Sequence, residues 1–253
     1  MKEGEESGYI FDIQKFCLHD GDGIRTNVFF SGCNLRCLWC ANPESRPSSH
    51  SGENNARKMT VGEVVGEVLK DKAFYDKSGG GVTLTGGEVF LQLGFAEKLC
   101  TALRKEKIHI ALETAGCVPQ RDFAALCDLA DFVFIDCKHY DEAKHVAGTG
   151  VSNAPILRNI TWLARSGKAC CVRIPVIPAY NDKTEDAQAF CELFQTLGVR
   201  RVQLLPFHQF GEKKYENLGL DYAYRGVPQL HKEDLHDYLK IFEKSGFDAA
   251  IGG

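Results

Sequence analysis

Three cysteines, Cys33, Cys37 and Cys40, lie within eight residues and are the clearest candidates for chemistry in this sequence. Thiolates this close together can converge on one metal centre, and sulfur ligands favour zinc, copper(I) or iron–sulfur clusters. A structural zinc site uses four protein ligands, but no fourth cysteine or histidine follows at ligand spacing. We therefore rank a [4Fe–4S] cluster with one open iron above structural zinc or unligated core thiols.

The composition is that of an ordinary soluble globular protein. The 253 residues are 44% hydrophobic and 25% charged, with a formal net charge of −4, so we expect no nucleic-acid partner. No apolar run reaches membrane-spanning length, and the acidic N-terminus lacks a signal-peptide core. We expect a cytoplasmic protein without disulfides, in which most of the other eight cysteines are small core residues.

Strand and helix patterns alternate along most of the chain. Apolar strands are predicted at 27–31, 82–85, 108–112, 132–135, 170–176 and 202–205, and Thr60 with Glu63 predicts a capping box at the start of a helix. Six such units indicate a parallel sheet with outer helices, curled into a barrel or partial barrel. We predict one domain over residues 1–253, with an N-terminal extension at 1–26, a surface loop at 43–59 and a C-terminal segment with a helix at 209–253.

Polar residues recur where the predicted strands end, and in barrels that edge carries the active site. They are Glu88, Glu113, Asp136, Lys138 and His208. Asp136 and Lys138 are two residues apart on one strand, so they should point the same way. Taken alone, a strand-end salt bridge explains that pair equally well, and His208 alone is as consistent with a structural histidine.

Arg173 lies inside an apolar strand and needs an anionic partner, because a buried unpaired guanidinium is very costly. That partner is a carboxylate either of the protein or of a ligand. Gly86 and Gly87 before Glu88 would let a ligand approach the backbone, although a plain turn is as good an explanation. No dinucleotide fingerprint or Walker motif is present.

The spacing Cys33-x-x-x-Cys37-x-x-Cys40, with Trp39 before the last cysteine, resembles the signature of the radical S-adenosylmethionine (SAM) superfamily. Further motifs, in order along nearly the whole chain, resemble the activating enzymes of glycyl radical enzymes, of the pyruvate formate-lyase activase type. They are residues 20–26, 29–33, 38–44, 80–83, 86–88, 136–138, 149–153, 174–178 and 204–208.

The resemblance implies a partial (β/α)6 barrel of TIM type that binds one [4Fe–4S] cluster and SAM. Cys33, Cys37 and Cys40 would ligate the cluster, and Arg173 would face SAM or the target peptide in the catalytic site. The residues implied to bind SAM are Trp39, Cys40, Ala41, Gly86, Gly87, Glu88, Glu113, Asp136, Cys137, Lys138 and His208. A monovalent cation is implied near Glu113, Thr114 and Asp136.

The implied reaction is reductive cleavage of SAM to a 5′-deoxyadenosyl radical, which abstracts hydrogen from a glycine of a partner glycyl radical enzyme. No cysteine occurs between Cys40 and Cys100, where many relatives insert a ferredoxin-like segment, so the expectation is a single cluster reduced by an external flavodoxin or ferredoxin. A monomer is expected.

The sequence departs from the family at three positions. Ala41 occupies a position where family members frequently have histidine, and Val89 one where proline is common. Glu113 occupies a position where aspartate is typical, and its longer carboxylate alters the cavity of the implied cation site.

Two other functions are weighed against glycyl radical activation. One is a radical SAM enzyme acting on a small molecule or on anaerobic ribonucleotide reductase. The other is a non-catalytic cysteine-bound metal or electron-carrier module. The length of the match beyond the three cysteines favours the activating enzymes over both.

Overall fold

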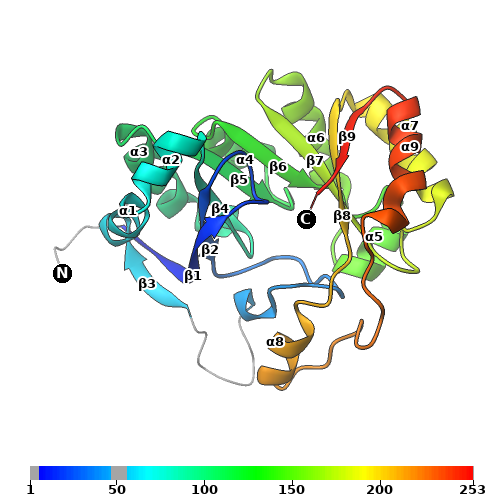
Figure 1. The fold of residues 1–253 in the computed structure, drawn as a ribbon, viewed down its shortest axis with the longest axis horizontal. Helices are drawn as coiled ribbons and strands as arrows, with labels where there is room; N and C mark the ends of the chain where they lie inside the picture. Colours follow the sequence, from blue (N-terminus) through cyan, green and yellow to red (C-terminus); the bar gives the residue numbers. More distant parts are fainter. Residues whose placement is uncertain (1–5, 47–55, 253) are drawn as a thin grey trace. The chain divides into compact units, whose positions relative to one another are not determined.

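The computed structural model describes residues 6–46 and 56–252 (Figure 1). The chain divides into two compact units. The first spans Met1–Asn34, Glu44–Thr114 and Arg121–Val133, and the second spans Leu35–Pro43, Ala115–Gln120 and Phe134–Gly253. The assignment of both to one domain over 1–253 stays a prediction.

The first unit contains a sheet of five strands in the order β3-β1-β2-β4-β5. Strands β2, β4 and β5 are parallel to one another, whereas β1 is antiparallel to β2 and β3. The strands are β1 (Ser7–Cys17), β2 (Arg25–Phe30), β3 (Arg57–Thr60), β4 (Gly81–Gly86) and β5 (His109–Thr114).

Two predictions for this part of the chain need correction. In the N-terminal extension, apolar alternation predicts only a short strand at Tyr9–Ile13, whereas the structure has an eleven-residue strand there. The predicted loop 43–59 begins with a short 3-10 turn, η1 (Pro43–Ser45), and its last residues form β3 on the edge of β1. A four-residue polar edge strand gives almost no sequence signal, because only Met59 of β3 is buried. Residues 47–55 of the loop lie outside the described residues.

Strand β4 shows how the sequence places the polar side chains. Val82 and Leu84 are fully buried on one face, while Thr83 and Thr85 alternate onto the other. The parallel register pairs Thr85 with Phe29 of β2, and Thr83 with Ala111 of β5. The face that carries Thr83 and Thr85 therefore presents hydroxyl groups next to apolar side chains, whereas Val82 and Leu84 lie in the core.

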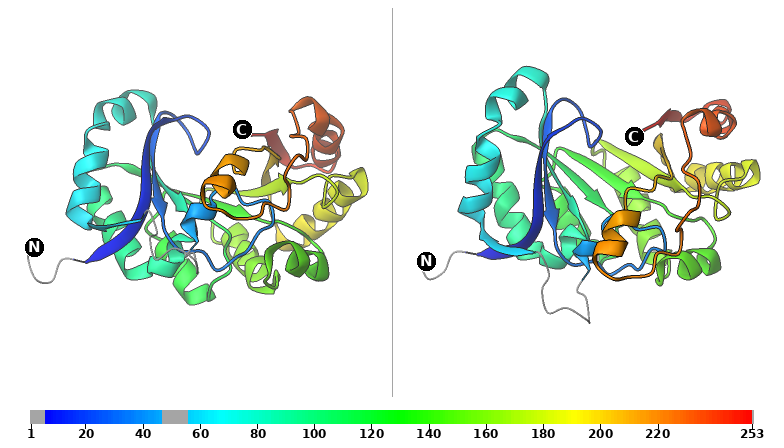
Figure 2. Two further views of the ribbon diagram at one scale, coloured as in Figure 1. Left: turned by 90° about the horizontal axis from the view of Figure 1, so that it is seen from below. Right: turned by 60° about the horizontal axis from the view of Figure 1, so that its bottom comes forward.

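Helices cover the apolar face of the first unit; both views of Figure 2 show α1–α3 running along the β1 side. These elements are α1 (Val61–Leu69), α2 (Lys72–Ser78), η2 (Val89–Gln92), α3 (Leu93–Lys105) and α4 (Gln120–Cys127), whose first residue belongs to the second unit. The predicted capping box is confirmed, since Thr60 caps α1 and Glu63 bonds back to its backbone. Fully burying a side chain such as Leu99 contributes about 1.5–3 kcal/mol.

The second unit contains three parallel strands, β7 (Cys170–Val176), β8 (Arg201–Pro206) and β9 (Asp248–Ile251), in that order. Strand β6 (Phe132–Asp136) crosses the boundary between the units at Val133–Phe134. Strand β9 was not predicted, because its residues alternate between exposed and half-buried positions and lack an apolar run.

The helices of the second unit are α5 (Glu142–Thr149), α6 (Ala154–Arg165), α7 (Thr184–Leu197), α8 (Glu212–Asn217), η3 (Glu233–Leu235) and α9 (His236–Lys244). Helices α7 and α9 pack side by side (Figure 1), with Phe194 and Phe242 ring centroids 6.3 Å apart. Helix α7 ends before Gly198, which adopts the left-handed conformation typical of a glycine at a helix end, with φ of 82°. The α/β class with a mostly parallel sheet is confirmed. In residues 6–46 and 56–252, no helix is long and apolar enough to cross a lipid bilayer.

Candidate active site

The cysteine loop, which we define as residues 33–43, has little regular structure. A backbone bond from Cys40 N to Cys37 O, 3.3 Å long, closes a turn that carries these two thiols. Cys37 is buried, whereas Cys33 and Cys40 are half-buried, and none of the three forms a disulfide. Three neighbouring thiols outside any disulfide are chemically suited to iron–sulfur ligation. Among the described residues, no three His, Cys, Asp or Glu side chains are already arranged as a metal site.

Helix α5 anchors the second-unit part of this loop. Arg36 N donates to Thr149 O at 2.7 Å, and Leu38 N donates to Gly148 O at 3.0 Å. A Cβ at Gly148 would lie 2.7 Å from the ring of Tyr180, so only glycine fits there without a shift. Gly148 and Thr149 therefore hold the loop through their backbone carbonyls, a role that sequence reasoning did not assign.

Trp39 lies in an aromatic cluster of the second unit and is only 8% exposed. Its ring centroid is 4.6 Å from that of Tyr180 and 6.2 Å from that of Tyr224. The cluster fixes the orientation of the loop between Cys37 and Cys40. Contact of Trp39 and the half-buried Ala41 with SAM stays a prediction.

In the first unit, the Gly86-Gly87-Glu88 turn rests on the backbone that leads into the cysteine loop. Gly87 N donates to Phe30 O at 2.9 Å, and Glu88 N donates to Gly32 O at 2.7 Å. A Cβ at Gly87 would collide with the Gly32 carbonyl oxygen, and Gly86 has φ of 113°, so both positions require glycine. The turn thus lies directly beside the segment that ends at Cys33.

The carboxylate of Glu88 is fully buried, and Thr114 at the end of β5 donates to its Oε1 at 2.7 Å. The neighbouring residue Glu113 accepts a 2.6 Å bond at Oε2 from Thr85. Glu88 and Thr114 are therefore in direct contact beyond the carboxyl ends of β4 and β5, whereas Glu113 bonds to Thr85; the binding of SAM or a cation by these residues stays a prediction. Their carboxylate and hydroxyl oxygens are hard ligands that suit a monovalent cation or an ammonium group.

In the second unit, Asp136, Lys138 and Arg173 form one charged network. Lys138 Nζ lies 2.8 Å from Asp136 Oδ2, and Arg173 Nε lies 3.2 Å from Asp136 Oδ1. The expectation that Asp136 and Lys138 point the same way is confirmed. The anionic partner required by Arg173 is Asp136, and the guanidinium also lies 4.9 Å from the centroid of the Phe134 ring.

The network joins the carboxylate of Asp136 to the cationic side chains of Lys138 and Arg173. Burial raises the pKa of Asp136, but the attraction of Lys138 and Arg173 outweighs it, so that this pKa lies below its usual value. Asp136 is therefore ionised at neutral pH.

Cys137 and His208 occupy different environments from the network. Cys137 is 1% exposed, and burial raises the pKa of its thiol to about 12, so its side chain is a core residue rather than a thiolate ligand. His208 is half-buried and stacks on the exposed ring of Phe210 at 4.2 Å. Burial lowers the pKa of His208, which keeps the imidazole neutral at pH 7. Roles of both residues in cofactor binding stay predictions.

Asn181 is a residue of this region that sequence reasoning missed. It is fully buried, and its amide donates to Lys138 O at 3.1 Å and to Pro175 O at 2.9 Å while its Oδ1 accepts from Ile177 N. Asn181 thus joins the loops that follow β6 and β7. The sequence signal that could have indicated Asn181 is its position as a polar residue shortly after the buried strand β7.

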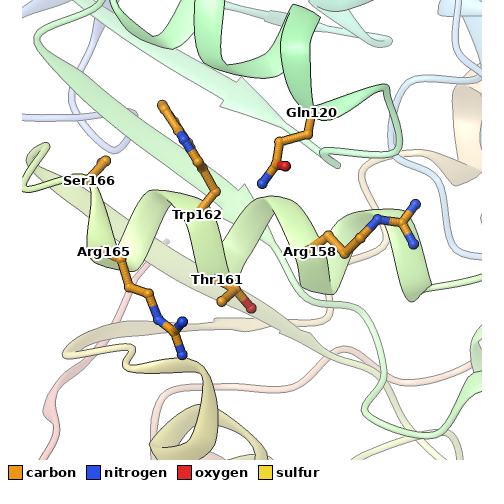
Figure 3. Close-up of a pocket in the computed structure, with 6 residues that line it drawn as sticks. All are labelled: Gln120, Arg158, Thr161, Trp162, Arg165 and Ser166. Atoms are coloured by element: carbon orange, nitrogen blue, oxygen red, sulfur yellow. The ribbon is translucent and has the colours of Figure 1, made fainter.

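A hollow of about 420 Å³ lies on α6, away from these residues (Figure 3). Trp162 and Gln120 lie on one side of the helix in this view, whereas Arg165 points to the other side. No predicted site residue lines this hollow, and it is not part of the candidate active site.

The sequence matches known proteins over almost its full length. Residues 27–191 match the Radical SAM superfamily. The trans-4-hydroxy-L-proline dehydratase activating enzyme of Clostridioides difficile is 32% identical over 96% of this chain and 99% of its own. The pyruvate formate-lyase 2-activating enzyme of Escherichia coli K12 is 34% identical over 96% of this chain and 92% of its own.

Solved structures are similar in fold. A domain of the pyruvate-formate lyase-activating enzyme from Bacteroides vulgatus has a TM-score of 0.58 at 24% identity, covering 69% of this chain and 99% of that domain. A radical SAM methyltransferase from Sphaerobacter thermophilus has a TM-score of 0.62 at 16% identity, covering 90% of this chain and 66% of that protein. These similarities confirm the predicted partial-barrel fold.

The fold and the superfamily match define the class as enzymes that use SAM and a [4Fe–4S] cluster. The chain belongs to the radical SAM superfamily and, within it, to the activating enzymes of glycyl radical enzymes. It is therefore an oxidoreductase whose partner is a glycyl radical enzyme.

Proposed function

We propose that this enzyme reductively cleaves SAM and uses the resulting 5′-deoxyadenosyl radical to abstract hydrogen from a glycine of its partner protein. The observation that carries the proposal is identity of 32–34% to activating enzymes over 96% of the chain. Pyruvate formate-lyase or a related glycyl radical enzyme is the substrate protein that this similarity favours. Glycine suits the reaction because a loop without side chains can enter a narrow site.

Cys33, Cys37 and Cys40 are the ligands of the cluster in this proposal. Their spacing and reduced thiols support it, as does the turn that joins Cys37 to Cys40. When bound, the cluster supplies the electron that cleaves the sulfonium of SAM. The protein holds SAM in place and excludes water from the reacting groups.

Two groups of residues hold SAM. In the first unit, Glu88 beside the Gly86-Gly87 turn offers a buried carboxylate to the ammonium group, and Glu113 with Thr114 offers oxygen ligands to a monovalent cation. In the second unit, Lys138 and Arg173 provide positive charge around Asp136. Cation binding at Glu113, Thr114 and Asp136, and contacts from Trp39, Ala41, Cys137 and His208, are part of the proposal by family resemblance.

The enzyme has one cluster and takes its electron from a separate flavodoxin or ferredoxin. The absence of cysteine between Cys40 and Cys100 supports this arrangement. The alignment to the hydroxyproline dehydratase activating enzyme is 298 positions long, so it includes positions absent from this chain of 253. A cytoplasmic monomer in an anaerobic cell fits this chemistry.

Anaerobic reconstitution followed by reaction with SAM and dithionite tests the first half of the proposal. Iron and sulfide near four per chain, together with 5′-deoxyadenosine and methionine, are expected. The Cys37→Ala variant should lose both the bound iron and sulfide and the cleavage of SAM to 5′-deoxyadenosine and methionine. A protein that binds only zinc and releases no 5′-deoxyadenosine would contradict the proposal and favour a non-catalytic metal module.

A radical SAM enzyme for a small molecule or for anaerobic ribonucleotide reductase would also cleave SAM. It would leave the glycine of other glycyl radical enzymes intact. Electron paramagnetic resonance (EPR) spectra of the partner therefore separate these possibilities from the proposed function.

A further inference from the structure

Residues 208–224 of the second unit lie against the end of the cysteine loop. A Cβ at Gly211 would lie 2.8 Å from Cys40 O and 3.2 Å from Ala41 Cα, so the two backbones are in direct contact. Lys214 Nζ donates to Asn42 Oδ1 at 2.9 Å. This segment therefore forms the immediate surroundings of Cys40.

Tyr222 lies in this segment with its ring enclosed. It is 5% exposed, and its ring centroid is 4.6 Å from that of Tyr215 and 6.4 Å from that of Tyr224. Tyr224 in turn contacts Trp39 of the cysteine loop. Burial, followed by the nearby Tyr215 and Cys40, raises the pKa of Tyr222, so its hydroxyl keeps its proton.

The Tyr222 hydroxyl has no hydrogen-bond partner among residues 6–46 and 56–252. Leaving a buried hydroxyl unsatisfied costs about 1–3 kcal/mol, so an acceptor outside the described protein atoms is expected. Tyr180 differs in this respect, although it also packs on the cysteine loop. Its hydroxyl donates to Lys144 O at 3.1 Å.

We propose that Tyr222 donates its hydroxyl hydrogen bond to sulfur on the Cys40 side of the bound iron–sulfur cluster and thereby raises the reduction potential of the cluster. The inference rests on the proposed ligation by Cys33, Cys37 and Cys40. Hydrogen bonds to cluster sulfur stabilise the added negative charge of the reduced form and are a main control on the potential. Through this direct contact with the cofactor, Tyr222 acts on the electron-accepting step.

The test compares wild type, Tyr222→Phe and the matched control Tyr180→Phe, each reconstituted anaerobically and titrated without SAM by EPR-monitored potentiometry. At the midpoint potential of the wild-type cluster, the ratio of reduced to oxidised cluster should be approximately fivefold lower in Tyr222→Phe than in wild type. For a one-electron couple this equals a shift of about 40 mV to more negative potential. Tyr180→Phe should leave the midpoint unchanged.

Replacing Tyr222 by 3-fluorotyrosine provides a second variant that keeps the ring and the hydroxyl. The fluorine makes the hydroxyl a stronger donor, so the midpoint should move to more positive potential, and a fluorine hyperfine coupling to the reduced cluster should appear. This measurement decides the matter if Tyr222→Phe proves too unstable to hold iron.

An unchanged midpoint potential in both Tyr222 variants would overturn the inference. The Tyr222 hydroxyl would then donate to a water molecule instead of to cluster sulfur. Iron and sulfide analysis keeps this failure distinct from failure of the proposed function. A wild-type protein that assembles no cluster contradicts the proposed function, whereas full cluster content with an unchanged midpoint contradicts only the role of Tyr222.

Discussion

The side-chain amide of Asn181, in the loop after β7, donates a 3.1 Å hydrogen bond to the backbone oxygen of Lys138, just past the end of β6. Lys138 in turn holds Asp136, which also binds Arg173. The charged network of the second unit therefore depends on an uncharged residue that bonds to the backbone of Lys138 rather than to its ammonium group. The amide fixes the loop, and the loop sets the direction of the lysine.

Asn181→Asp should destabilise the protein by about 2–3 kcal/mol. The variant keeps the size of the side chain but replaces the amide donor to the oxygens of Lys138 and Pro175 by an acceptor, leaving buried carbonyls unsatisfied. Urea unfolding of the apo-protein measures the change. Asn217→Ala, at an exposed position, is the control and should change the free energy of unfolding by less than about 0.5 kcal/mol. Equal stability of the two variants would refute this role of Asn181.

Asp136→Asn should cost about 2–4 kcal/mol of stability at pH 7, because it removes a largely buried carboxylate that pairs with both Lys138 and Arg173. The Asp237–Lys240 pair provides the matched control. It has a similar length of 2.9 Å but is exposed, so Asp237→Asn should have almost no effect. Denaturant unfolding of both variants gives the comparison, and similar losses would contradict the role assigned to burial.

The contribution of Asp136 should also depend on pH. Its folded pKa is lowered, so the stabilisation is complete above the unfolded value of about 4 and is lost as the pH falls through the folded value. The stability difference between wild type and Asp136→Asn should therefore shrink in acid. A difference that stays constant from pH 7 to pH 3 would rule out this linkage.

His145 predicts a second pH effect of the same sign, in a higher pH range than that of Asp136. It is fully buried, its Nδ1 lies 2.7 Å from Val151 O, and burial lowers its pKa below the usual 6.5. As the pH falls below about 6.5, the unfolded chain takes up a proton before the folded protein does, so stability is lost. His145→Asn keeps a donor near Val151 O and removes the titration.

The unfolding free energy of His145→Asn should therefore vary less between pH 7.5 and pH 5 than that of wild type. The difference in slope is at most about 1.4 kcal/mol per pH unit, the limit for one proton. Parallel stability curves for the two proteins would show that His145 does not titrate on folding.

The cysteines should separate into ligands and core residues. Cys37→Ser should reduce iron bound after reconstitution from about four per chain to well below one, since three thiolates are the minimum for the cluster. Cys17→Ser, at a half-buried cysteine of β1, should retain the wild-type iron content. Loss of iron in Cys17→Ser, or its retention in Cys37→Ser, would contradict the assignment.

The sequence predicted those parts of the molecule that repeat a strong local pattern. Buried strands such as β4 and β7 and the capped start of α1 at Thr60 follow from apolar periodicity and capping chemistry. The Asp136–Lys138 pair follows from the two-residue repeat of a strand. These are interactions between residues close in sequence.

The parts that escaped prediction depend on distant or weakly patterned segments. Strand β3 is short and polar, and β9 has no fully buried residue, so tertiary pairing rather than periodicity forms both. The contact of Gly211 with Cys40 joins residues 171 positions apart, and the bonds of Asn181 connect two loops. Nothing local in the sequence reports such contacts.

The most direct test of the function measures the glycine radical itself. The enzyme is incubated anaerobically with SAM, a reductant and a glycyl radical enzyme that carries glycine deuterated at Cα; pyruvate formate-lyase is the first choice and hydroxyproline dehydratase the second. We predict a glycyl EPR doublet in the unlabelled partner, its collapse to a single line in the labelled partner, and one deuterium in 5′-deoxyadenosine. SAM cleavage without a doublet in any glycyl radical enzyme tested, and without transfer of deuterium, would contradict the proposed function.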